Sequence, residues 1–415
     1  MSTIVLFHLG VGGAPGLCPF ASWARSKDDG FAMNHPLSRR SFLGKASAAG
    51  LALALPRVSD ASPVANVLET RVISQQPAHY HGWPTLLRRR NGELFLAYSG
   101  GRESHVCPFG RVELMTSRDG GDSWAYPRVL LDGPADTRDA GLVETTKGTI
   151  LVTTFTSLAY EPVLAKAEKA GGWEPERLAR WRAASNRLIG DRRKAEPGVW
   201  MIRSTDDGTT WGGRYDVPVN SPHGPAQLAD GRLLYVGKDL WRGGKVGVCE
   251  SSDDGQTWRW LSQVPVRDGD SAAQYHELHT VETADGRILC HIRNENKSNH
   301  GETLQCESSD GGKTWSVPAG IGVWGLPSHL LRLRNGHLLM SYGHRRRPLG
   351  NQARLSTDHG RTWSDPIIIS GDGIGTDLGY PSTVELDDGT LVSVWYEVMQ
   401  GSPRAILRQA KWKLG

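Results

Sequence analysis

The sequence predicts an all-β protein, a six-bladed β-propeller, and three observations lead to that expectation. A corner motif, Ser-x-Asp-x-Gly-x-x-Trp, occurs five times in the 415 residues. A second pattern, two apolar strands joined by a tight turn that ends in glycine, occurs six times. The composition, with 50 Gly and 15 Trp beside 38% hydrophobic residues, is typical of short strands and turns rather than of a helical bundle.

The corner motif has the chemistry of a hairpin corner. Its Ser and Asp can accept hydrogen bonds from backbone N–H groups, its Gly tolerates a positive φ, and its Trp can fold back as an apolar plug. Five full matches are a strong signal of a structural repeat. The copies begin at Ser117, Ser204, Ser251, Ser308 and Ser356.

The glycine turns alternate with the corners along the chain. They end at Gly92, Gly148, Gly231, Gly286, Gly336 and Gly389. Five of these six glycines follow Asn or Asp, which is the strongest short hairpin signal. Six hairpins and five corners make six four-stranded units, as expected of propeller blades. The strand-like residues 68–74 are expected to complete the last blade and close the ring.

The longest interval between turn glycines is 83 residues, from Gly148 to Gly231 (231 − 148). It contains a polar segment with helical character. We therefore expect a helical insertion in blade two over residues 158–197. The insertion is either a lid over the site or a solvated pair of surface helices.

Residues 1–65 are expected to be a leader rather than part of the fold. Residues 38–45 (SRRSFLGK) have the pattern of a twin-arginine export signal, and Met33 is the suspected true start. The alternative is a chance arginine pair before a helix. We expect the propeller to span residues 66–415 and the folded protein to be exported to the periplasm or secreted.

Charge and cysteine content exclude several other classes. The net charge of +4 comes without a long run of either sign, which argues against a nucleic-acid partner. No apolar stretch approaches 18 residues, so no membrane span is expected. Cys18 lies in the leader, and the other four cysteines match no zinc pattern. We expect a monomer without a metal or cofactor, since the histidines near strand ends also lack ligand spacing.

The innermost strand of each blade runs along the central channel, so strand ends remote from the glycine turns should meet at one mouth. Before the turns these residues are His81, Asp139, His223, Glu277, Ser328, His329 and Tyr380. After the turns they are Arg102, Thr156, Lys238, Arg293, residues 345–347, Tyr396 and Glu397. Together they predict a cationic pocket for an acidic, polar ligand. For each residue singly, a salt bridge at a blade rim is the alternative.

The repeats and two further segments resemble the sialidase (neuraminidase, BNR-repeat) superfamily, in which the corner motif is the Asp-box. Residues 276–294, which include HELHTVE, DGRIL and RN, are similar to the sialidase segment that carries the catalytic glutamate and a substrate arginine. Residues 379–382 (GYPS) resemble the segment with the nucleophilic tyrosine. The resemblance implies that Tyr380 attacks the anomeric carbon, that Glu277 is its base and that Arg293 holds the substrate carboxylate.

This pairing suits a sugar whose anomeric carbon bears a carboxylate. A neutral tyrosine can approach such a centre, whereas an anionic nucleophile would be repelled. The alternatives are a core aromatic role for Tyr380 and a structural ion pair between Glu277 and Arg293.

The sequence also departs from the family pattern. The Arg-Ile-Pro motif of the first blade is replaced in residues 81–84 (HGWP), where Gly82 stands for the arginine. The acid/base aspartate is not evident in the following loop, where His105 or Glu103 is the candidate proton donor. Arg102 matches a family arginine. The third arginine is one of residues 345–347, with Arg347 preferred.

The sequence thus predicts an exported, sialidase-like exo-glycoside hydrolase that releases a terminal acidic sugar from glycans by a retaining Tyr/Glu mechanism. The alternatives are action on a non-sialic sugar, cleavage of uronates as a lyase, or non-catalytic glycan binding. The predicted catalytic residues are Tyr380, Glu277, His105 and Asp139. The predicted substrate-binding residues are Arg102, Arg293, Arg347, His223, Lys238 and His81.

Overall fold

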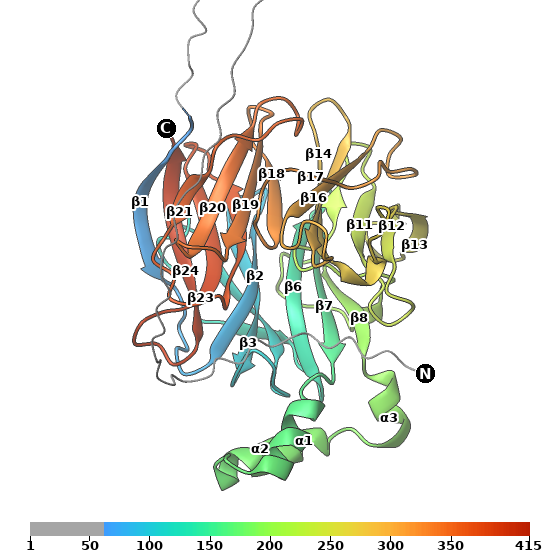
Figure 1. Cartoon of the computed structure of the whole chain (residues 1–415), viewed down its shortest axis with the longest axis vertical. Helices are drawn as coiled ribbons and strands as arrows, with labels where there is room; N and C mark the ends of the chain where they lie inside the picture. The colour runs from blue at the N-terminus through green and yellow to red at the C-terminus, as the bar shows by residue number, and fades with distance from the viewer. Residues whose placement is uncertain (1–61) are drawn as a thin grey trace, which may run out of the picture. The chain divides into compact units, whose positions relative to one another are not determined.

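A computed structural model describes residues 62–415 and confirms the six-bladed, all-β propeller (Figure 1). Residues 1–61, which include the predicted twin-arginine signal, lie outside the described residues. Within the described part of the chain, no helix is long and apolar enough to cross a membrane.

Each blade is a four-stranded antiparallel sheet. Blade one contains β2 (Tyr80–Arg88), β3 (Leu94–Arg102), β4 (Arg111–Ser117) and β5 (Arg128–Leu131). Blade two contains β6 (Asp136–Glu144), β7 (Ile150–Ser157), β8 (Gly198–Ser204) and β9 (Tyr215–Asp216). Blade three contains β10 (Ala226–Gln227), β11 (Leu233–Lys238), β12 (Val246–Ser251) and β13 (Arg259–Gln263).

The remaining blades follow the same order from the axis outward. Blade four contains β14 (Tyr275–Glu282), β15 (Ile288–Asn294), β16 (Thr303–Ser308) and β17 (Ala319–Gly320), and a short 3₁₀ turn, Ala272–Gln274, precedes it. Blade five contains β18 (Ser328–Arg332), β19 (Leu338–His344), β20 (Gly350–Ser356) and β21 (Ile367–Ser370). Blade six contains β22 (Leu378–Glu385), β23 (Leu391–Val398), β24 (Ala405–Leu414) and, outermost, β1 (Ala65–Val72).

The ring closes through blade six. The N-terminal strand β1 pairs with the C-terminal strand β24, from Ala65 opposite Leu414 to Val72 opposite Arg408. The prediction that the N-terminal strand completes the last blade is therefore confirmed. Innermost strands also contact across blade boundaries, since β2 lies against both β6 and β22 and β14 lies against β18.

The corner motifs form the predicted hydrogen bonds. In the copy that begins at Ser251, the Gly255 N–H donates to the Ser251 hydroxyl at 2.9 Å, and that hydroxyl donates to Asp253 at 2.7 Å. Each motif tryptophan packs into the apolar cluster that its blade shares with the preceding blade. These tryptophans are Trp124, Trp211, Trp258, Trp315 and Trp363.

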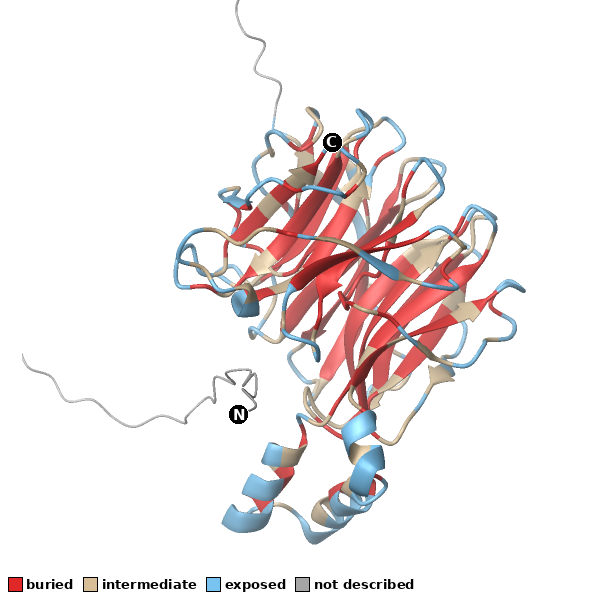
Figure 2. Ribbon diagram, turned by 90° about the vertical axis from the view of Figure 1, so that its right-hand side faces the viewer, coloured by how far each residue is buried: buried red, intermediate tan, exposed pale blue. Residues whose placement is uncertain are grey.

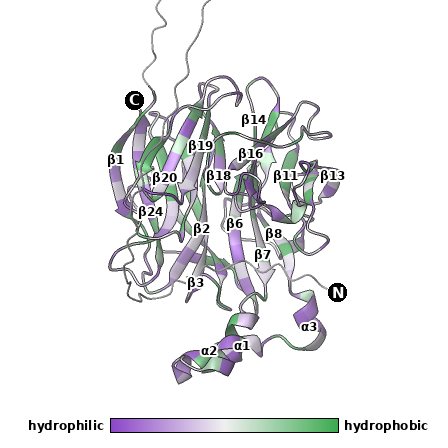
Figure 3. Ribbon diagram, in the orientation of Figure 1, coloured by the Kyte–Doolittle hydropathy of each residue, from purple (hydrophilic) through white to green (hydrophobic). Residues whose placement is uncertain are grey.

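Blade six has no corner motif, and its interface with blade five is filled differently. Trp395 and Trp412, both fully buried, pack there against Leu339 and Ile367. Buried residues follow the strands, while exposed residues lie in the loops (Figure 2). The hydropathy colouring shows the same pattern, with hydrophobic stretches along the strands (Figure 3).

The helical insertion of blade two is also present. Helices α1 (Glu161–Ala170), α2 (Pro175–Ser185) and α3 (Gly190–Ala195) lie between β7 and β8. They project from the end of these strands (Figure 1). Much of their surface is exposed (Figure 2).

Candidate active site

Four innermost strands carry a non-glycine residue with positive φ near the predicted mouth. The residues are Trp83 (53°), Asp139 (51°), Glu277 (40°) and Tyr380 (53°). Each lies at a register shift between the innermost strand and its neighbour. Such backbone conformations are uncommon and typically cost 1–3 kcal/mol, and bulges often redirect side chains at functional sites. Four blades therefore use the same bulge to direct one side chain each.

Three of the predicted residues meet at the centre of this site. The Tyr380 hydroxyl donates a hydrogen bond to one carboxylate oxygen of Glu277. Arg293 donates to the other oxygen of Glu277 at 2.7 Å and to the Tyr380 hydroxyl at 3.3 Å. The Nε group of Arg293 donates to Glu295 at 2.7 Å. The structure thus brings together Tyr380, Glu277 and Arg293.

The charges at this centre favour an ionised glutamate beside a neutral tyrosine. Burial raises the pKa of Glu277, but the charge of Arg293 and the hydrogen bonds from Tyr380 and Arg293 outweigh it and leave the pKa below its usual value. Burial and the Glu277 charge raise the pKa of Tyr380 well above its usual value. Glu277 can accept the phenolic proton when Tyr380 forms a bond, as nucleophilic catalysis by a tyrosine requires.

Asp139 is a second carboxylate close to this pair. It is buried, and burial together with the Glu277 charge raises its pKa to about 7. Arg138 and Arg102 oppose that shift. Near neutral pH the Asp139 carboxyl group is therefore partly protonated and can donate a hydrogen bond to a substrate oxygen.

His105 lies in a polar network that the sequence did not reveal. Its Nδ1 atom lies 3.0 Å from Asp377 and 2.9 Å from the Tyr80 hydroxyl. Tyr80 and Tyr396 both donate to Asp377, at 3.0 and 3.1 Å. The His105 side chain keeps 40% of its surface exposed. Burial of the remainder lowers the pKa of His105, and the hydrogen bond to Asp377 partly opposes this shift.

Tyr80 packs beside Gly82, the residue that stands in the sequence for the first-blade arginine. A Cβ atom at Gly82 would lie 3.0 Å from Cε1 of Tyr80, so the tyrosine ring fills the room beside this backbone. The Tyr80 hydroxyl connects that position to Asp377 and His105. In place of an arginine, the site therefore presents a tyrosine–aspartate–histidine network.

The prediction that Arg102 binds substrate is not supported by its position. Arg102 is only 1% exposed. It donates to both oxygens of Asp136, at 2.7 and 3.1 Å, and to the carbonyl oxygens of Ser104 and His105. Its guanidinium also lies 4.8 Å from the Trp83 ring centroid. Arg102 supports the wall of the site and has no accessible donor for a ligand.

The sequence predicts that one of residues 345–347 is the third arginine of the sialidase pattern, and it favours Arg347. In the structure, Arg345 is better placed for that role. Arg347 is exposed, and Arg346 turns away to stack on Trp324 at 4.7 Å. Arg345 donates to the Leu378 carbonyl at 3.0 Å, two residues before Tyr380. The chain conformation after β19, which the sequence does not specify, decides which of the three arginines faces the site.

The other predicted ligand-binding residues are mostly buried beneath the mouth. His81 is fully buried with its Nδ1 atom 2.8 Å from the Ser74 hydroxyl. His223 is 2% exposed and packs against His279 and His329, with ring centroids 5.1 and 4.9 Å apart. Neither His81 nor His223 is placed to contact a substrate. Across residues 62–415, no group of His, Cys, Asp and Glu has the arrangement of a metal site.

Lys238 lies closer to the reactive centre. It donates to the Ala273 carbonyl at 2.5 Å, and its Nζ atom lies 3.5 Å from His276. Burial lowers the pKa of Lys238 to about 8, while the Glu277 charge opposes the shift. Lys238 therefore supports the Glu277 side of the site electrostatically.

The predicted cationic mouth is in fact largely charge-compensated. Asp136 pairs with both Arg102 and Arg138, and Glu277 and Glu295 pair with Arg293. The sequence predicted Glu277 and Tyr396 at the mouth, but not the compensating carboxylates Asp136 and Glu295 or the packing of Tyr80 and Trp83 against Tyr396. A signal existed for Trp83, which follows Gly82 in the altered first-blade motif.

Comparison with known proteins agrees with the fold. Residues 189–393 match the family described as a BNR repeat-like domain. A protein of unknown function from Dyadobacter fermentans aligns over 85% of this chain and 99% of its own, at 24% identity and a TM-score of 0.68. The Hadza microbial sialidase Hz136 aligns over 80% of this chain and 65% of its own, at 19% identity and a TM-score of 0.59.

The NanB sialidase of Streptococcus pneumoniae aligns over 83% of this chain and 70% of its own, at 14% identity and a TM-score of 0.59. No curated protein matches the sequence. The fold and the repeats define a six-bladed propeller of the sialidase type. This chain shares that propeller fold with the two sialidases, and residues 189–393 match the BNR repeat-like domain.

Proposed function

We propose that this protein is an exported, retaining exo-glycoside hydrolase that releases a terminal acidic sugar from glycans. One observation carries the proposal: backbone bulges in blades four and six place the Tyr380 hydroxyl on the Glu277 carboxylate, and Arg293 donates to both groups. A glycan-binding propeller has no need for such a buried nucleophile–base pair. The twin-arginine pattern of residues 38–45 supports export.

In the first step, the Tyr380 oxygen bonds to the anomeric carbon while Glu277 takes the phenolic proton. His105 gives a proton to the departing glycosidic oxygen. In the second step, neutral His105 takes a proton from water, and the water oxygen bonds to the anomeric carbon. The bond to Tyr380 breaks as Glu277 returns the proton to the phenolate, so both groups are restored.

His105 suits the role of acid and base better than Asp139. Its side chain is 40% exposed, whereas Asp139 is 8% exposed beside the nucleophile. A leaving group must depart toward solvent, so the residue that protonates it must face the opening. Asp139 then binds a hydroxyl of the sugar held in the pocket. Arg293 and Arg345 are the donors available for the sugar carboxylate.

Replacing His105 by alanine should affect substrates according to their leaving groups. Turnover of sialyllactose, whose leaving group needs a proton, should fall by about 10²–10⁴-fold. Turnover of 4-methylumbelliferyl sialoside, with its more acidic leaving group, should fall far less.

In the wild type, activity should decline as pH rises through the His105 pKa, which lies below 6.5. It should also decline as pH falls through the Glu277 pKa, which lies below 4.5.

Steady-state kinetics with both substrates across pH 4–8 tests this assignment. His337→Ala is the matched control, because His337 follows the Gly336 turn at the opposite end of blade five. Equal losses on the two substrates in His105→Ala would rule out His105 as the proton donor.

The Tyr80 substitution favours a second candidate, in which the same site acts on an acidic sugar other than sialic acid. Gly82 replaces the arginine of the sialidase motif, and Tyr80 packs beside it with its hydroxyl on Asp377, so the contacts to a sugar carboxylate must differ. Digestion of a polysaccharide panel followed by mass spectrometry separates the candidates. Hydrolysis adds water to the products, whereas a uronate lyase leaves an unsaturated sugar without added water.

A further inference from the structure

The loop of residues 103–110, which carries His105, is held on both sides of that residue by the helical insertion. We propose that the insertion positions His105 for proton transfer and that Glu103 is the positioning residue through which it acts. This proposal rests on the proposed function, in which His105 is the acid and base. The proposal gives a role to the insertion, which the sequence alone could assign equally to a lid or to a solvated pair of surface helices.

On the N-terminal side of His105, the contact is polar. One carboxylate oxygen of Glu103 accepts hydrogen bonds from Arg180 at 2.8 and 3.1 Å. The other oxygen accepts from the Trp181 indole N–H at 3.0 Å and lies 3.4 Å from Arg177. All three partners belong to α2. Because both Glu103 oxygens bind residues of α2, Glu103 is not available as a proton donor for a substrate.

On the C-terminal side of His105, the contact is mainly apolar. Cys107 is fully buried in a cluster with Tyr160, Leu164 and Trp181 of the insertion. The Phe109 ring packs edge-on to Trp181, with centroids 6.2 Å apart. These contacts fix the loop two and four residues beyond His105, while the His105 ring points to Asp377 and Tyr80 on the other side.

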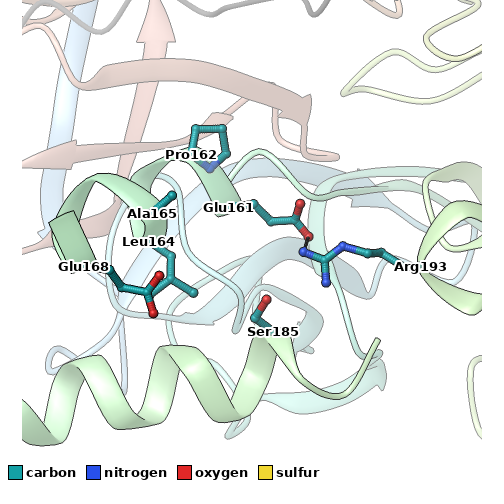
Figure 4. Close-up of a pocket in the computed structure, with 7 residues that line it drawn as sticks. All are labelled: Glu161, Pro162, Leu164, Ala165, Glu168, Ser185 and Arg193. Carbon is teal, nitrogen blue, oxygen red and sulfur yellow. Dashed lines mark ion pairs between the residues drawn. The ribbon is translucent and has the colours of Figure 1, made fainter. Parts of the chain in front are cut away.

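The insertion depends on the loop in turn. Its helices have 10, 11 and 6 residues, lengths that are marginal for isolated helices in water. Between them lies an open pocket of about 400 Å³, bridged by the Glu161–Arg193 ion pair (Figure 4). Trp181, which packs on Cys107 and Phe109, is the largest fully buried side chain of α2. The loop and the insertion therefore share one small core.

A shared core favours a fixed support over a lid. Opening a lid at this contact would expose Trp181 and Cys107 and leave the Glu103 carboxylate and its partners unpaired. A fixed loop keeps the His105 ring at hydrogen-bond distance from Asp377. Misplacement of a catalytic group by about 1 Å can cost on the order of 10²-fold in rate, so this support bears directly on turnover.

The test compares Glu103→Ala with Glu168→Ala. Glu168 is the matched control because it pairs with Arg182 at 2.6 Å within the same insertion but does not contact the loop. In Glu103→Ala, kcat for sialyllactose should fall by about 10–100-fold with KM nearly unchanged, while 4-methylumbelliferyl sialoside is turned over almost normally. Glu103→Gln, which retains one acceptor oxygen, should show a smaller loss. Glu168→Ala should match the wild type on both substrates.

A second readout does not depend on activity. The ¹⁵N chemical shifts of the His105 ring report its hydrogen bonds, and they should move toward those of a free imidazole in Glu103→Ala alone. Unchanged His105 shifts in Glu103→Ala would overturn the positioning role, as would equal losses of kcat on both substrates. Failure of the proposed function is a separate result, namely retained turnover in Tyr380→Phe, and it leaves the NMR comparison intact.

Discussion

Replacing Tyr380 by phenylalanine is expected to lower kcat for 4-methylumbelliferyl sialoside by at least about 10³-fold, as removal of a covalent nucleophile does in other enzymes. The substitution removes one oxygen from a ring that is 4% exposed and keeps its packing against Trp83 and Tyr396. The variant should fold normally. The loss should therefore appear in kcat at an unchanged melting temperature.

Tyr342→Phe is the control for loss of a buried tyrosine hydroxyl. Tyr342 is 1% exposed, and its hydroxyl donates to Gln352 at 2.9 Å within blade five. Loss of this hydroxyl should leave kcat within about twofold of the wild type, because neither Tyr342 nor Gln352 belongs to the candidate active site. Turnover by Tyr380→Phe at a comparable rate would remove the nucleophile from the proposed mechanism.

Replacing Asp136 by alanine is expected to lower the free energy of unfolding by about 3–5 kcal/mol, the usual cost of removing one partner from a buried ion pair. Asp136 is fully buried and accepts hydrogen bonds from Arg102 at 2.7 Å and from Arg138 at 2.7 Å. Without it, two buried guanidinium groups lose their only carboxylate partner among the described residues. Urea unfolding monitored by tryptophan fluorescence measures the change.

Asp387→Ala is the matched surface control. Asp387 pairs with Arg88 at 2.6 Å, but its side chain is 82% exposed, so its loss should cost less than about 1 kcal/mol. Should Asp136→Ala fail to fold, Asp136→Asn gives a smaller change in the same direction. A loss below 1 kcal/mol in Asp136→Ala would show that the buried network contributes little.

The repeats made the fold predictable because each signal is local. The Ser251 corner and the Asp230–Gly231 turn each form from residues close in sequence, and their order fixes the blade count. The closing strand was predictable for the same reason, since blade six lacked one strand. The Tyr380–Glu277 contact was predictable because both residues lie in segments that resemble a known family.

The rest of the site depends on contacts between distant segments. Asp377 lies 272 residues from His105, and no local pattern connects the two. Glu103 lies 78 residues from Trp181, so the support of the His105 loop was equally hidden. The choice of Arg345 over Arg347 depends on the path of one loop, where Arg346 stacks on Trp324.

Covalent trapping tests the central claim most directly. A sialosyl fluoride with a second fluorine beside the anomeric carbon should form the glycosyl–enzyme intermediate and slow its hydrolysis, because the fluorine destabilises the oxocarbenium-like transition state. Mass spectrometry of the digested wild type should then find the sugar on the peptide that contains Tyr380, and no such adduct in Tyr380→Phe. An adduct on another residue, or turnover of the sialoside with inversion at the anomeric carbon, would contradict the Tyr380–Glu277 mechanism.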